Sequence, residues 1–224
     1  MRIRTEELTR SFRVGTSEIK AVDRVNFELS DPEFIAIVGR SGSGKSTLLN
    51  LIGLNDHPSS GKIVIDSADC SLLSSNQRRR IRLHRMGFVF QTLNLFPTLN
   101  ALENVELPMA LAGKPHGVQK ERGKSLLEAV GLERRIEHRP KQLSMGEMQR
   151  VAIARAMSND PEIIIADEPT GELDSGTAKE IITLLRDINK RERKQVTIAT
   201  HDEKIIDEAD KVYIIHDGKL KRKR

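Results

Sequence analysis

The chain has 224 residues, of which 38% are hydrophobic and 31% are charged, and its formal net charge is +5. This composition is typical of a globular protein that buries a full core. No apolar run approaches the roughly 18 residues that a membrane span needs, and residues 1–7 lack the apolar core of a signal peptide, so we expect a cytosolic chain. Cys70 is the only cysteine, which excludes a disulfide framework and a cysteine-based zinc site.

Basic residues gather in two segments, residues 77–85 and 219–224. Such clusters can meet nucleic acid or anionic lipid headgroups, but a solvated helix face and a frayed terminus explain them more simply. The chain contains no tryptophan and only 3% aromatic residues, which leaves no stacking platform for a single strand. We therefore expect no direct contact with nucleic acid.

Near the N-terminus, residues 2–8 and 21–29 alternate apolar with polar side chains. Alternation of this kind predicts half-buried antiparallel strands, and hence a small β-layer. Phe12 lies in the polar connection between them, close to Gly15. An aromatic ring there either packs in the core or stacks on a purine, and the spacing favours the core.

A glycine-rich stretch follows residues 34–38, an apolar segment that suits a buried parallel strand. It has the pattern G-x-x-x-x-G-K-[ST] of a P-loop, whose backbone N–H groups surround phosphate oxygens at the start of a helix. Lys45 supplies a charge for the β and γ phosphates, and Ser46 supplies a hydroxyl ligand for Mg²⁺. The candidate residues of this stretch are Gly39, Arg40, Ser41, Gly42, Ser43, Gly44, Lys45, Ser46 and Thr47.

Residues 62–66 and 86–91 are the next predicted strands, and the second of them ends on Gln91. A glutamine at a strand end is usually a polar exit, but one that faces a P-loop can bind Mg²⁺ or orient a water molecule. From residue 95 to residue 142 the apolar spacing becomes helical. This stretch therefore predicts a helical lobe inserted in the core.

Residues 143–150 open a further helix. Ser144 and Glu147 have the spacing of a capping box, which marks the start of a helix. Gly146 is unfavourable in a first helical turn, so another group is expected to approach the backbone closely there. A helix cap alone and a contact with a ligand explain Ser144 equally well.

An apolar, β-branched run over residues 161–166 ends in two adjacent carboxylates, Asp167 and Glu168. Alternation places them on opposite sides at the carboxyl end of a strand, where α/β sheets bind ligands. Asp167 suits a magnesium ion held through water, and Glu168 suits the polarisation of an attacking water molecule. The alternative is an acidic strand end before a turn at Pro169, and the P-loop in the same chain argues against it.

The C-terminal part contains one amphipathic helix and two strands. Residues 171–174 precede the helix, whose apolar face carries Ala178, Ile181, Ile182, Leu185 and Ile188. The strands are residues 195–200, which end at His201, and residues 211–216. In a parallel sheet His201 would lie near the γ-phosphate, although an isolated histidine is more often structural.

In this order, the motifs resemble the nucleotide-binding subunit of ABC transporters over essentially the whole chain. The resemblance implies an α/β P-loop NTPase fold with a RecA-like core sheet, an N-terminal antiparallel β-layer and an inserted α-helical subdomain. It implies a single domain over residues 1–224, with the helical subdomain at roughly residues 95–157. ATP and Mg²⁺ are the implied cofactors, and ATP hydrolysis is the implied activity.

The resemblance also implies a role for each candidate residue. Phe12 would stack on adenine, which reverses the preference for the core, and the P-loop residues would bind ATP together with Gln91. The implied metal ligands are Ser46, Gln91 and Asp167, and the implied catalytic residues are Lys45, His201 and the general base Glu168. The implied contacts to the partner copy are Ser144, Met145, Gly146 and Glu147, which face the ATP of the opposite subunit, and Asp174 of the D-loop at the dimer interface.

Within the family, the chain looks like the lipoprotein-release and macrolide-export branch. The segments that carry this likeness are residues 87–91, 94–97, 102–108 and 170–174. The chain has no fused membrane domain, so it resembles a stand-alone ATPase subunit. Two positions depart from the family pattern: Met145 stands where glycine is usual, and Glu147 replaces the commoner glutamine and brings a negative charge near the phosphate site.

We therefore expect a subunit that dimerises on ATP with a second copy of itself and drives integral membrane permease subunits. The cargo would be hydrophobic or amphipathic, and the chain would sit peripherally at the inner face of the cell membrane. Two alternatives stay open. One is a membrane-coupled mechanical or signalling ATPase without cargo, and the other is a soluble ABC-type ATPase that acts on nucleic acid or ribosomes.

Overall fold

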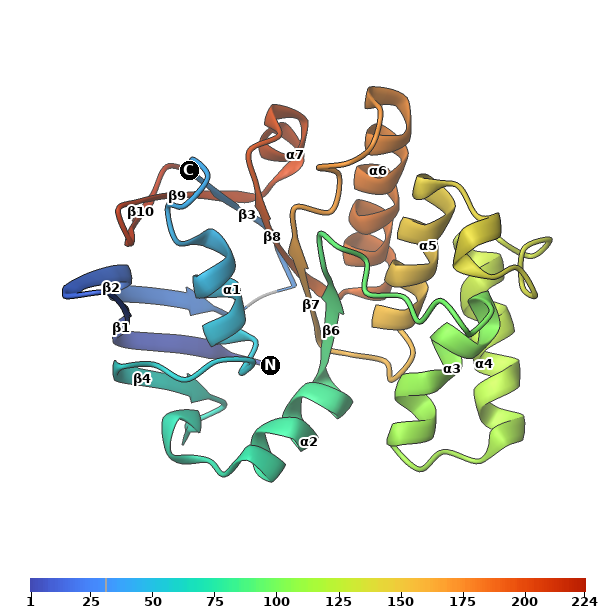
Figure 1. The fold of residues 1–224 in the computed structure, drawn as a ribbon, viewed down its shortest axis with the longest axis horizontal. Coiled ribbons are helices and arrows are strands. Elements are labelled where there is room, and N and C mark those ends of the chain that lie inside the picture. The colour runs from blue at the N-terminus through green and yellow to red at the C-terminus, as the bar shows by residue number, and fades with distance from the viewer. Residues whose placement is uncertain (31) are drawn as a thin grey trace.

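In the part of the chain that the structure describes, two β-sheets have helices between and around them (Figure 1). The structure is a computed structural model that describes residues 1–30 and 32–224. The larger sheet has the strand order β10-β9-β3-β8-β7-β6 within the described residues. Its strands are β3 (Phe34–Val38), β6 (Met86–Val89), β7 (Ile163–Asp167), β8 (Gln195–Thr200), β9 (Lys211–His216) and β10 (Lys219–Arg222).

Parallel pairing dominates the larger sheet. β3 lies between β8 and β9 and is parallel to both, and β7 is parallel to β6 and β8. Because parallel strands end at the same edge, the segments that follow β3, β7 and β8 meet there. β10 pairs antiparallel with β9, so the basic C-terminal segment is a paired strand and the expectation of a frayed terminus is wrong.

The smaller sheet is antiparallel throughout, which confirms the predicted N-terminal β-layer. Its strands are β1 (Ile3–Val14), β2 (Ser17–Leu29), β4 (Ser60–Ile65) and β5 (Ala68–Asp69), in the order β2-β1-β4-β5. β1 and β2 extend beyond the predicted strands because the polar connection pairs as a hairpin, with Phe12 opposite Ile19. Gly15 lies at the hairpin tip with a φ of 61°, a conformation that glycine adopts without a steric penalty.

The helices are α1 (Lys45–Ile52), α2 (Ser75–Arg85), α3 (Ala101–Leu111), α4 (His116–Ala129), α5 (Met145–Ala156), α6 (Ser175–Glu192) and α7 (Glu203–Glu208), with short 3-10 turns at Cys70–Leu72 and Pro140–Gln142. Helix α1 contacts both sheets. Figure 1 shows α3, α4 and α5 together at the side of the molecule remote from the smaller sheet, as the predicted helical lobe requires. In the described part of the chain, no helix has the length and apolar character needed to cross a membrane.

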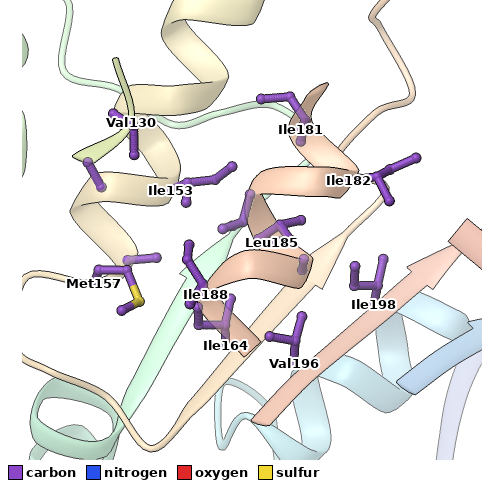
Figure 2. Packing of buried hydrophobic residues seen from close by; sticks show 14 of the residues in the cluster. Val130, Ile153, Met157, Ile164, Ile181, Ile182, Leu185, Ile188, Val196 and Ile198 are labelled. Carbon is purple, nitrogen blue, oxygen red and sulfur yellow. The ribbon is translucent and has the colours of Figure 1, made fainter. Parts of the chain in front are cut away.

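Two hydrophobic clusters cover the two faces of the larger sheet. Along β3, Phe34 and Ala36 belong to one cluster, and Ile35 and Ile37 belong to the other. Side chains alternate between the faces of a strand, so a strand buried on both faces must be continuously apolar. Figure 2 shows the first cluster, in which side chains of α5 and α6 pack on β7 and β8.

Leu185 provides a test of this packing because it is fully buried in the first cluster and points toward the sheet (Figure 2). We expect Leu185→Ala to lower the free energy of unfolding by about 3 kcal/mol, since the smaller side chain leaves a cavity. Urea unfolding followed by circular dichroism measures the change. Leu72→Ala is the control because Leu72 is 85% exposed, and its effect should stay below about 0.5 kcal/mol. Equal effects of the two variants would contradict the burial of Leu185 in the core.

Candidate functional site

The P-loop joins β3 to α1 and lines a cleft of about 310 Å³. Gly44 is the N-cap of helix α1, has a φ of 107° and provides no side-chain cap hydrogen bond. A β-carbon on Gly44 would also collide with the carbonyl oxygen of Ala21 in β2. The first N–H groups of α1 are therefore left for an anion, which the positive end of the helix dipole attracts.

Lys45 is the central cation of the cleft and is 7% exposed. Its Nζ donates hydrogen bonds to the carbonyl oxygens of Gly39, at 2.8 Å, and Arg40, at 3.2 Å. The same nitrogen lies 3.4 Å from Oε1 of Glu168. The second carboxylate oxygen of Glu168, Oε2, lies 3.0 Å from Nδ1 of His201. Lys45, Glu168 and His201 thus form one continuous polar chain across the cleft.

Glu168 reaches Lys45 because it lies just outside β7. Its φ is 46°, a left-handed conformation that costs a non-glycine residue energy and that clusters at functional sites. Its N–H donates to the carbonyl oxygen of Ala199 at 2.9 Å. The alternation rule therefore does not extend to Glu168: both carboxylates approach the start of α1, with Asp167 bonded to Ser46 and Glu168 paired with Lys45.

Asp167 is partly buried at the end of β7. Burial raises its pKa, the hydrogen bond from the Ser46 side chain lowers it, and the neighbouring Glu168 carboxylate raises it again, so that the pKa lies above its usual value. Among the described residues, Oδ1 of Asp167 is buried without a hydrogen-bond partner. A free carboxylate oxygen beside a serine hydroxyl is a donor set that suits a hard cation such as Mg²⁺.

Gln91 and His201 also line the cleft, as the sequence predicts. Gln91 is exposed and lies two residues beyond β6, while His201 directly follows β8. Ala21 lines the cleft as well, and the sequence missed it because nothing in its local pattern separates it from other strand residues. Its contact with Gly44 is visible only in three dimensions.

Phe12 is 40% exposed on β1, so its assignment to the core from spacing is wrong. The guanidinium carbon of Arg10 lies 4.7 Å from the centre of the Phe12 ring, a cation–π contact. Phe12 is not among the described residues that line the cleft. Stacking of Phe12 on adenine therefore stays a prediction.

Residues 144–147 form the start of α5 and lie outside the cleft as its described lining defines it. Ser144 is the N-cap, and its Oγ accepts a hydrogen bond from the N–H of Glu147 at 3.2 Å. The N–H of Ser144 donates to Oε2 of Glu147 at 2.8 Å, which confirms the predicted capping box. The hydrogen bond from Arg135, at 2.8 Å, holds the pKa of Glu147 below its usual value. The charge of Glu147 is thus paired within its own chain, while Met145 beside it is 38% exposed.

The group that approaches Gly146 is Thr177, in the first turn of α6. A β-carbon on Gly146 would lie 2.5 Å from Cγ2 of Thr177. The hydroxyl of Thr177 donates to Oδ2 of Asp174 at 2.6 Å, and Asp174 caps α6 by accepting from the N–H groups of Gly176 and Thr177. Gly146 and Asp174 therefore both contact Thr177. No local sequence pattern predicts the contact between Gly146 and Thr177.

A P-loop at a helix N-terminus, with two carboxylates and a histidine after adjacent parallel strands, defines a P-loop nucleoside triphosphatase. Residues 22–171 match the family described as ABC transporter. The chain therefore belongs to the ABC transporter family, as its ATP-binding cassette, and its activity is that of an ATPase.

Named relatives cover most of the chain. An uncharacterized ABC transporter ATP-binding protein of Thermotoga maritima is 46% identical, over 93% of this chain and 89% of that protein. The lipoprotein-releasing system ATP-binding protein LolD of Legionella pneumophila is 42% identical, over 96% of this chain and 95% of that protein. The macrolide export ATP-binding/permease protein MacB of Vibrio parahaemolyticus is 43% identical, and this chain spans 33% of its length. The predicted branch of the family is thus confirmed.

Solved structures agree with the fold. The ATP-binding cassette MJ0796, in a dimeric post-hydrolysis state bound to ADP and Pi, superposes with a TM-score of 0.91 at 39% identity, and the match covers 99% of both chains. A second dimeric structure of the same cassette gives a TM-score of 0.91 at 40% identity. These matches confirm the predicted α/β P-loop NTPase fold.

The buried Asp167 carboxylate predicts a gain in stability when its charge is removed. Because its folded pKa is raised, the ionised group destabilises the fold at neutral pH, and this penalty disappears as the pH falls through the folded pKa. We expect Asp167→Asn to raise the melting temperature of the protein without nucleotide at neutral pH by roughly 2–4 °C, the size typical of one stabilising substitution in a chain of this length. Scanning calorimetry should show the gain shrinking toward pH 4.

Asp160→Asn is the matched control for this experiment. The hydrogen bond from Lys194 holds the pKa of Asp160 below its usual value, so its charge stabilises the fold where the charge of Asp167 does not. Asp160→Asn should leave the melting temperature unchanged or lower it. A melting temperature of Asp167→Asn below that of the parent would show that the charge of Asp167 does not destabilise the fold.

Proposed function

We propose that the chain hydrolyses ATP as a head-to-tail homodimer in which each ATP lies between the P-loop cleft of one copy and the start of α5 of the other. The observation that carries the proposal is the separation of the two halves. The cleft contains Lys45 and Glu168, whereas Ser144 and Gly146 begin a helix elsewhere on the surface. A twofold axis places the cleft of each copy against the start of α5 of the other copy, so that identical faces form two equivalent ATP sites. The dimeric structures of the related MJ0796 cassette support this arrangement.

In the proposed mechanism, Lys45 and the first N–H groups of α1 bind the β and γ phosphates, and the ring of Phe12 stacks on adenine. Ser46, Gln91 and Asp167 would hold Mg²⁺, which adds positive charge against the phosphates when bound. Glu168 takes the proton of the attacking water molecule as the general base. His201 holds Oε2 of Glu168 through Nδ1, so that the carboxylate keeps its orientation.

In the partner copy, the start of α5 supplies the remaining contacts to the γ-phosphate. Ser144 donates its hydroxyl, and Met145 and Gly146 present backbone N–H groups at the positive end of the helix. The N–H of Glu147 is donated to Oγ of Ser144, so Glu147 orients the serine that faces the phosphate. Asp174 lies at the same interface because Thr177 joins it to Gly146. The ion pair with Arg135 removes much of the repulsion that Glu147 would exert on ATP.

The membrane partner is proposed to dock in an apolar groove of about 400 Å³ between α2, β6, α3 and α5. Phe88 and Phe90 stack there with ring centres 5.8 Å apart. Phe96 and Leu111 line the same groove although they are 50% and 63% exposed, and exposed apolar patches of this kind mark interaction sites.

A helix of a permease subunit is the occupant that we propose. MacB carries a permease in the same chain as its cassette, by its name, and this chain spans only a third of it. Arg79 and Arg82 of α2 also line the groove, which favours an occupant with acidic residues beside its apolar ones. The chain would thereby sit peripherally at the inner face of the membrane. The names of LolD and MacB support an amphipathic or hydrophobic cargo.

The dimer is tested with a variant that binds ATP but does not hydrolyse it. Glu168→Gln keeps the shape of the side chain and removes the base, so ATP should stay bound and hold two copies together. Size exclusion with light scattering should show a dimer with MgATP and a monomer without it. Glu168→Gln combined with Lys45→Ala is the control, because it lacks the phosphate-binding charge and should remain monomeric. A Glu168→Gln protein that stays monomeric at saturating MgATP would refute the sandwich.

The groove is tested by placing a charge in its apolar wall. The permease is obtained by co-purification with the tagged protein from solubilised native membranes. Leu111→Asp should abolish the stimulation of ATPase activity by this permease. The basal ATPase activity should stay within twofold of the parent. Val118→Asp is the matched control: Val118 is 48% exposed on α4 and lies outside the described lining of the groove. Equal stimulation of both variants would exclude this groove as the docking site.

A further inference from the structure

We propose that Arg155 is a positioning residue that couples the groove to the ATP-facing end of α5. It ties the segment after Gln91 to the last turn of the helix that begins at Ser144. The proposal rests on the proposed function, because it assigns a coupling role between the docking groove and the composite ATP site. It adds a residue that lies in neither the P-loop nor the first turn of α5.

The contacts of Arg155 are directed at two consecutive carbonyl groups. Nη2 of Arg155 donates to the carbonyl oxygen of Leu93 at 2.6 Å, and Nη1 donates to that of Asn94 at 2.5 Å. The planar guanidinium presents two parallel N–H donors, so it holds both carbonyls in one geometry. A single hydrogen bond would leave the segment free to rotate, but this fork fixes its orientation relative to α5.

The segment held in this way has a costly backbone conformation. Leu93 and Asn94 have φ angles of 56° and 51°, both in the left-handed region that is unfavourable for leucine in particular. Three further hydrogen bonds stabilise the turn. Leu93 N–H donates to the carbonyl oxygen of Phe90 at 3.0 Å, Asn94 N–H donates to that of Thr92 at 2.5 Å, and Thr92 Oγ1 donates to Oδ1 of Asn94 at 3.0 Å. Strained turns persist only where surrounding groups impose them, and Arg155 is the cation that does so here.

Arg155 stands between the two sites that must communicate. Arg155, Asn94 and Phe96 line the groove, whereas Gln91, three residues before Asn94, lines the P-loop cleft. Arg155 follows Ser144 by eleven residues on α5, which is about 16 Å along a helix with a 1.5 Å rise. A rigid helix passes displacement at its last turn to its first. An occupant that moves the Leu93–Asn94 turn would therefore move the start of α5 as well.

The environment of Arg155 makes it a tight connection. Arg155 is partly buried. Burial lowers its pKa, but the guanidinium keeps its charge because the ordinary pKa of arginine is so high. Such a group depends on its acceptors, since a donor left without one costs free energy in the interior. The turn and the helix thus each lose a partner if they separate.

The same helix offers a matched control. Arg150 lies on α5 five residues earlier, and its guanidinium donates to the carbonyl oxygen of Val130 at 3.0 Å and to Glu180 of α6 at 2.7 Å. These contacts join α5 to the end of α4 and to α6, and they leave the Leu93–Asn94 turn untouched. Arg150→Met and Arg155→Met therefore remove the same donors from different connections.

The first measurement is hydrogen–deuterium exchange of peptides that cover residues 90–96. Arg155→Met should raise the exchange rate of this segment at least tenfold, and Arg150→Met should leave it within twofold of the parent. Parental exchange rates in Arg155→Met would overturn the proposal. Should Arg155→Met fail to fold, Arg155→Lys keeps the charge but lacks the planar fork, and it is measured against the same expectation.

The second measurement asks whether the connection reaches the composite site. In the Glu168→Gln background, Arg155→Met should raise the MgATP concentration for half-maximal dimerisation at least tenfold, while monomer affinity for a fluorescent ATP analogue stays within twofold. A general loss of structure would change both quantities. Unchanged dimerisation despite faster exchange would overturn the coupling role. If the Glu168→Gln parent itself stays monomeric, the sandwich fails, and the exchange experiment still decides whether Arg155 holds the turn.

Discussion

The carboxyl ends of β3, β7 and β8 meet at the first turn of α1, and the chemistry of the protein depends on this convergence. A lysine that is 7% exposed needs partners, because an isolated buried charge is strongly unfavourable. Lys45 finds them in carbonyl groups that follow β3 and in the carboxylate that follows β7. The topology of the sheet therefore determines whether the charge of Lys45 is balanced. A strand out of register would leave its ammonium group unpaired.

Local chemistry made much of the fold and site predictable. The P-loop, the carboxylates after a β-branched strand and the capping box at Ser144 are short-range patterns whose residues act through their own backbone. Features that depend on distant segments escaped prediction. The left-handed turn at Glu168 and the contact of Thr177 with Gly146 arise from neighbours remote in sequence. The assignment of Phe12 to the core from spacing is wrong for the same reason. Its strand extends further than the alternation of apolar and polar residues indicates, and its exposure follows from its place in the hairpin.

The two departures from the family pattern have different structural contexts. Glu147 completes the capping box and pairs with Arg135. These two interactions within the chain offset its negative charge and weaken its repulsion of a phosphate. Met145 packs into no hydrophobic cluster among the described residues and is 38% exposed. It contributes a backbone N–H and a flexible thioether to the surface that we propose faces a partner copy, and methionine adapts readily to such contacts.

The contact between Gly146 and Thr177 also restricts how this protein can diverge. Any side chain at position 146 needs the space that the Thr177 methyl group occupies, and a smaller residue at position 177 must still supply the hydroxyl that bonds to Asp174. Serine is the natural substitute that meets both demands. The two positions are therefore expected to change as a pair: descendants of this chain that acquire alanine at 146 should carry serine at 177, and those that keep glycine are free to keep threonine.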